Sequence, residues 1–108
     1  MPTTTNLVES RKKTFFSFQY PNSGKIRIKI VSNVAVDIFI LPGNIDVNKI
    51  NSVNDAISQG AISYPNRTLL PDQIVILNPN WRPFGWKLII GNPTSINAAI
   101  SYDIVEVT

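Results

Sequence analysis

The strongest constraint on the fold is an alternation of apolar and polar residues between positions 25 and 40. Isoleucine occupies positions 26, 28 and 30 between Lys25, Arg27 and Lys29, and the even positions from 34 to 40 are again aliphatic. Because successive side chains of a strand point to opposite faces, this period predicts antiparallel strands with one buried face. Ser32 and Asn33 separate the two runs, and they predict either a tight turn or one continuous strand with a bulge.

Further extended segments follow at short intervals, and turn signals rich in Pro, Gly and Asn separate them. This pattern predicts an all-β fold, namely a single antiparallel β-sandwich of jelly-roll-like or immunoglobulin-like type with seven to eight strands. Asp37 and Phe39 then fall on the solvated side of their strand. In residues 46–59 the apolar spacing is roughly helical, so we expect one short helical turn there, capped by Asp46 and ended by Gly60.

The length of 108 residues suggests one domain. We expect residues 14–108 to form the sandwich and residues 1–13 to form a flexible basic N-terminal arm. Six of the ten Lys and Arg residues lie within the first 30 positions, so the excess positive charge belongs to the N-terminal third.

The absence of Cys and His limits the chemistry that the chain can perform. Disulfides, a Cys nucleophile, the commonest general base and the commonest transition-metal ligand are all excluded. Around Asp46, the oxygen-bearing side chains lack the glycine and closing glutamate of a calcium loop. We therefore expect no metal, no cofactor and no catalytic activity.

No stretch approaches the roughly 20 apolar residues of a membrane-spanning helix, so no transmembrane segment is expected. We expect a cytoplasmic protein if the chain is complete as given, and a secreted one if a leader has been removed.

The first candidate site is the basic ladder of Lys25, Arg27 and Lys29, which residues 11–13 could extend. One hypothesis is an anion-binding face for phospholipid head groups or an acidic partner. The simpler interpretation is the solvated side of a strand, where lysine also protects an edge from pairing. Nucleic acid is not an expected partner, because no aromatic residues interleave with these cations as stacking platforms require.

The second candidate site is the aromatic segment 78–86, which contains Trp81, Arg82 and Phe84 between prolines. Exposed Trp beside Arg is a common composition of binding hot spots, and flat rings in loops suit sugar stacking. With Tyr64, these residues are candidate ligand-binding residues. The alternative is structural: Trp86 would start a core strand, and Trp81 or Phe84 would cover an end of the sandwich.

Two stretches resemble a known type of domain. "FFSFQYPNSGKIRIKIVSNVAVDIFILPGN" (15–44) is similar to the opening strands of GOLD-like β-sandwich domains, and "FGWKLIIGNPTSINAAISYDIVEV" (84–107) resembles their last strands. Bacterial pre-peptidase C-terminal domains look similar at the same place. The resemblance implies a β-sandwich that serves in protein interaction, in cargo or lipid contact, or as an accessory domain. It implies no catalytic residues, and the acidic cluster that would imply calcium is missing.

From these observations we expect a non-catalytic binding or assembly module that acts through protein–protein contacts, including self-association into a homo-oligomer. Two alternatives stay open. One is a carbohydrate-binding module that uses the loop aromatics, and the other is binding of anions or lipid surfaces through the basic N-terminal third.

Overall fold

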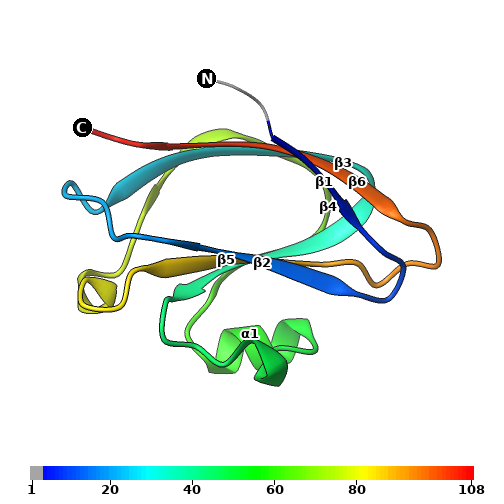
Figure 1. The fold of residues 1–108 in the computed structure, drawn as a ribbon, viewed down its shortest axis with the longest axis horizontal. Helices are drawn as coiled ribbons and strands as arrows, with labels where there is room; N and C mark the ends of the chain where they lie inside the picture. The colour runs from blue at the N-terminus through cyan, green and yellow to red at the C-terminus, as the bar shows by residue number, and fades with distance from the viewer. Residues whose placement is uncertain (1–3) are drawn as a thin grey trace.

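The computed structural model describes residues 4–108, which form mainly antiparallel strands (Figure 1). In this part of the chain the elements are β1 (Thr4–Val8), β2 (Lys13–Phe18), β3 (Lys25–Pro42), α1 (Val53–Ser58), β4 (Ile62–Ile76), β5 (Trp86–Gly91) and β6 (Ala98–Glu106). Two short 3-10 helices, η1 (Val47–Lys49) and η2 (Pro79–Trp81), lie in the connections. The prediction of a single all-β antiparallel sandwich is confirmed.

Strand β3 organises the sandwich because its two halves belong to different layers. Its first half pairs with β6 between Ile26 and Ser32, and its second half pairs with β5 between Asp37 and Pro42. Beyond these, β1 extends the layer of β6 and β2 extends the layer of β5. We call them the upper layer and the lower layer, as they lie in Figure 1.

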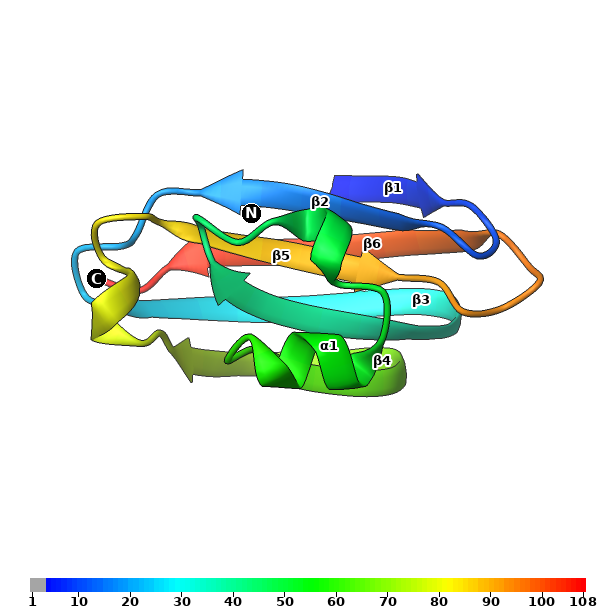
Figure 2. The same cartoon turned by 90° about the horizontal axis from the view of Figure 1, so that it is seen from below.

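The two layers are joined on one side of the molecule. Strand β4 pairs with β3 along both halves, from Lys25 opposite Ile76 to Ile40 opposite Ile62. On the other side lie β1 and β2, which are the two ends of the strand order and do not pair with each other (Figure 2). The antiparallel sheet is therefore nearly closed on itself, as in a flattened barrel.

The even-numbered aliphatic residues of β3 line the space between the layers, as the alternation predicts. Six of them are almost completely buried: Ile26, Ile28, Ile30, Val36, Ile38 and Ile40. Val34 is partly buried and packs against the same cluster. Removing each such side chain from water contributes about 1.5–3 kcal/mol, so this strand supplies much of the stability of the core.

Residues 4–108 contain six strands where seven to eight were expected. Ser32 and Asn33 form no turn: β3 runs through them, with shifts in its register against β4. Ser32 is buried there, and its hydroxyl donates to the carbonyl of Val34 at 2.6 Å. Residues 62–76 likewise form one strand, because an edge strand tolerates Pro65 and Pro71.

The N-terminal segment belongs largely to the sheet and does not form the expected flexible arm. Thr4–Val8 forms β1 and pairs with β6, with Val8 opposite Ala98, and Val8 is buried. Lys13 is already the first residue of β2. The physical reason is that β6 offers an unpaired edge, which a short strand with apolar Leu7 and Val8 can complete. Residues 1–3 of the expected arm lie outside the described residues.

Residues 43–61, which we call the covering segment, lie against the outer side of the lower layer (Figure 2). The predicted helical turn is confirmed: η1 and α1 lie here, and the Asp46 carboxylate accepts from the Asn48 amide at the start of η1. Ile50 and Ala56 pack on Phe39, Leu41 and Ile89 in a second core cluster. Phe39 is therefore buried, and the prediction that it lies on a solvated face is wrong.

Candidate functional site

The outer side of the upper layer, which we call the upper face, carries the predicted basic ladder. Residues directly opposite one another in a ladder share a face, so the registers define its members. From β3 and β4 they are Lys25, Arg27, Lys29, Val31, Leu69, Ile74 and Ile76. From β6 and β1 they are Val105, Asp103, Ser101, Ala99 and Leu7.

Large aliphatic side chains on the upper face are unusually exposed. The exposed fractions on β3 and β4 are 43% for Val31, 49% for Leu69, 50% for Ile74 and 70% for Ile76. The solvated face of an antiparallel sheet is normally polar, and adjoining exposed apolar side chains often mark an interaction site. In residues 4–108 no helix lies over this face, whereas the covering segment lies over the opposite one (Figure 1).

The charges of the upper face are of both signs. The Arg27 Nε atom lies 3.5 Å from an Asp72 carboxylate oxygen, and Lys29 stands directly opposite Asp103 on β6. Lys25 and Arg27 neighbour Ile76 and Ile74 across the β3–β4 ladder. The face is thus mixed rather than uniformly basic, and anion binding by Lys25, Arg27 and Lys29 stays a prediction.

The other three N-terminal cations do not extend this ladder. Arg11 and Lys12 lie in the turn between β1 and β2, and Lys13 begins β2 in the lower layer. They line a groove on the opposite side of the molecule. Sequence proximity suggested one basic surface, but the fold distributes the six cations over two.

The outer edge of β4 is protected against pairing with another strand. In the described chain β4 pairs with β3, and two of the three register shifts in this ladder include Pro71 and Pro65. Proline lacks the amide donor that a new ladder would need, and such irregularities are common at natural edges. This edge is therefore a poor template for pairing with a strand of another molecule.

The loop aromatics do not form one surface. Trp81 is buried in the main core, with 7% of its surface exposed, so its ring is not available for stacking on a sugar. Trp86 is also buried and stacks on Phe18 at a ring distance of 4.3 Å, which agrees with its structural interpretation. Tyr64 lies on β4 opposite Ile38, away from the turn that holds Phe84.

Arg82 and Phe84 do come together, beside a residue that the sequence interpretation did not select. Both line a shallow depression with Tyr20, and the Arg82 guanidinium lies 4.6 Å above the Tyr20 ring. Phe84 is half-exposed. Tyr20 was missed because it lies about 60 residues before Arg82 in the sequence, and no local pattern indicates that the fold brings them together. Carbohydrate binding stays a prediction, now with two of its four candidate residues adjacent.

The fold changes the titration of Tyr64. Partial burial raises the pKa of its phenol above the ordinary value of 10.0, and nearby Arg67 opposes this effect. The side chain accordingly stays neutral at physiological pH. Among residues 4–108, no three His, Cys, Asp or Glu side chains gather as metal ligands would.

No helix in the described part of the chain combines the length and apolar character needed to cross a membrane. Comparison of the chain with known protein families, curated proteins and solved structures finds no match.

Proposed function

We propose that this protein is a non-catalytic binding module that acts through protein–protein contact, and that its partner is a second copy of the same chain. The observation that carries the proposal is the presence of two pairs of exposed aliphatic side chains on the upper face: Ile74 with Ile76 on β4, and Leu69 on β4 opposite Val31 on β3. Burying such side chains against a partner would contribute about 25 cal/mol per Å² of apolar surface.

The charge pattern favours a second copy over an acidic or basic partner. A two-fold interface brings the same patch of both subunits together, so the patch must be complementary to itself. The upper face holds Lys25 and Arg27 as well as Asp72 and Asp103, so cations of one copy can oppose carboxylates of the other. A surface of one sign would repel its own copy.

The resemblance of residues 15–44 and 84–107 to GOLD-like and pre-peptidase C-terminal domains supports the same class of function. The resemblance implies a domain that acts by contact with other molecules and has no catalytic residues. The upper face includes Lys25, Arg27 and Val31, which lie in the first of these stretches.

The test measures the molar mass by sedimentation over a wide range of protein concentrations, for wild type and for an Ile74→Asp/Ile76→Asp variant. We expect a concentration-dependent dimer for wild type and a monomer for the variant. Both isoleucines are at least half-exposed, so the variant should still fold. Ile57→Asp is the control, because the exposed fraction of Ile57, 57%, lies between those of Ile74 and Ile76, but Ile57 is on α1, on the opposite side.

The dimer should survive in the control. Wild type that stays monomeric at the highest concentration would refute the proposal. So would a dimer that the upper-face variant leaves intact.

A further inference from the structure

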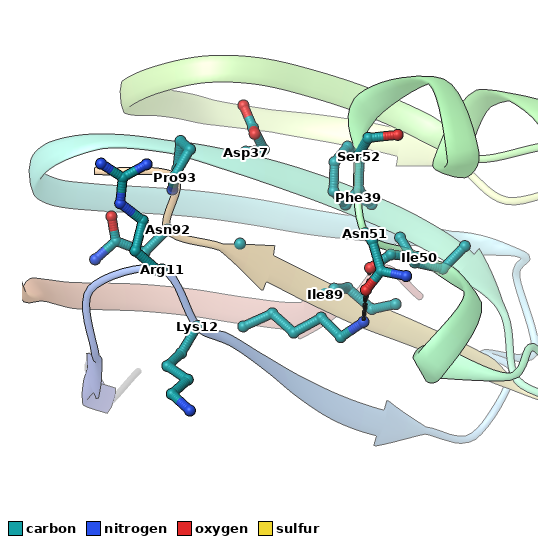
Figure 3. Close-up of a pocket in the computed structure, with 12 residues that line it drawn as sticks. Arg11, Lys12, Asp37, Phe39, Ile50, Asn51, Ser52, Ile89, Asn92 and Pro93 are labelled. Carbon is teal, nitrogen blue, oxygen red and sulfur yellow. Dashed lines mark hydrogen bonds between the residues drawn. The ribbon is translucent and has the colours of Figure 1, made fainter. Parts of the chain in front are cut away.

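A groove of about 440 Å³ lies on the outer side of the lower layer, away from the upper face (Figure 3). Residues 50–52 of the covering segment form one wall, and residues 11–13 form the other. Phe39 and Ile89 line it between these walls, and Gly91 is a further lining residue. The volume falls within the range of roughly 300–1,000 Å³ that is typical of small-molecule sites.

Gly91 keeps this groove open. In the ladders it stands between Asp37 on β3 and Lys13 on β2, so a side chain at position 91 would fill the gap between them. Its φ is not in the left-handed region, and a Cβ built on it would meet no atom within 4 Å. Neither backbone conformation nor packing therefore requires glycine, and glycine in a strand often marks a close approach of another molecule.

The charges around the groove favour an anion. The Lys13 ammonium is already occupied: it donates to the Val47 and Ile50 carbonyls at 2.5 and 2.7 Å. Arg11 and Lys12 are exposed, and within residues 4–108 neither forms an ion pair. The Asp37 carboxylate accepts from the Asn66 amide at 2.9 Å, which partly satisfies the one acid that lines the groove.

We propose that this groove binds a small organic anion with an apolar body. The carboxylate or phosphate head is held by the Arg11 guanidinium, Lys12 adds positive charge to the same rim, and the body lies over Gly91 against Phe39 and Ile89. An arginine guanidinium offers paired donors that suit both head groups, and the cations on the rim draw the anion into a groove with an apolar floor. The site is separate from the upper face and does not depend on self-association.

The test is an NMR titration of backbone amides with phenyl phosphate, benzoate and inorganic phosphate. We expect saturable shifts at Gly91, Phe39 and Asn51 with at least one of the two aromatic anions, and much weaker binding of inorganic phosphate, which has no apolar body. The tighter of phenyl phosphate and benzoate identifies the preferred head group. Equal affinity for inorganic phosphate, or no saturable shift with either aromatic anion, would overturn the proposal.

Three variants locate the site. Gly91→Val should abolish binding while leaving the melting temperature unchanged or higher, because a β-branched residue suits a strand with open space at this position. Arg11→Asn should weaken binding by about tenfold or more, and asparagine tolerates the positive φ of 62° at this position. Lys25→Gln removes one charge from the upper face and should leave the affinity unchanged.

Wild-type affinity in Gly91→Val would refute the assigned position. An equal loss in Lys25→Gln and Arg11→Asn would show attraction by net charge alone, which also contradicts the proposal. If Gly91→Val does not fold, the same titration of Gly91→Ala, in which binding should weaken, replaces it.

Discussion

The two outer faces of the sandwich are built from the same strand but have opposite surroundings. Outward residues of the first half of β3 are Lys25, Arg27, Lys29 and Val31, and they face solvent. Outward residues of the second half include Phe39 and Leu41, and the covering segment buries both. One face is completed within the chain, and we propose that a second copy completes the other.

The lysines show the same difference. On the lower layer, Lys13 donates to carbonyls of Val47 and Ile50, and Lys87 donates to the carbonyl of Gly43, so both attach the covering segment to the sheet. On the upper face, Lys25 has no ion pair within the described residues. The role of a lysine on a strand therefore depends on whether another segment of the chain covers that face of the sheet.

The largest difference in stability should be between a substitution in the interior and one on the upper face. Ile28→Lys would bury an unpaired charge at a position with no exposed surface, and we expect a loss of about 4 kcal/mol or more, enough to prevent folding. Arg27→Glu, one position away and solvent-exposed, should cost only about 0.5 kcal/mol, mostly through repulsion from Asp72. Chemical denaturation measures both, and equal losses would show that the assigned orientation of β3 is wrong.

The same substitution on each outer face should give unequal results. Leu41→Ala removes a completely buried side chain beneath the covering segment and should cost about 2–5 kcal/mol. Leu69→Ala on the upper face should cost less than about 1 kcal/mol in the monomer, since half of its surface is already exposed. A large loss at Leu69 under dilute conditions would mean that the upper face is covered within one molecule.

The smallest difference in stability is expected between substitutions of two lysines, one on each outer face. Lys13→Met removes the donors that hold η1 and the following loop, and we expect a loss of about 1–2 kcal/mol with faster amide exchange in residues 47–58. Lys25→Met, its counterpart on the upper face, should change the stability of the monomer by less than about 0.5 kcal/mol. Exchange rates that do not differ between the two variants would contradict the role assigned to Lys13.

The interior could be predicted from the sequence because a period of two is a local signal. The burial of the even positions from 26 to 40 could be predicted from the geometry of a strand alone. The helical region could be predicted because Asp46 and Gly60 are suitable residues for its start and its end. A local signal for the covered face was also present: Ile38 to Leu41 is an unbroken apolar run, which is typical of a strand buried on both sides.

The pairing of strands that lie far apart in the sequence could not be predicted from local patterns. Pairing of Thr4–Val8 with β6 joins segments at opposite ends of the chain, and nothing near Leu7 predicts its partner. For the same reason the sequence placed Arg11–Lys13 together with Lys25–Lys29, although the fold separates them onto two faces. The burial of Trp81 likewise depends on how η2 folds back onto the core rather than on its own neighbours.

The most direct test of the central claim is a dilution series followed by methyl NMR of the isotope-labelled protein. If a second copy covers the upper face, the methyl signals of Val31, Leu69, Ile74 and Ile76 should shift with protein concentration. Those of Leu41 and Ile89, which the covering segment buries, should stay constant. Upper-face signals that do not move at any concentration, or equal shifts on both faces, would contradict the claim.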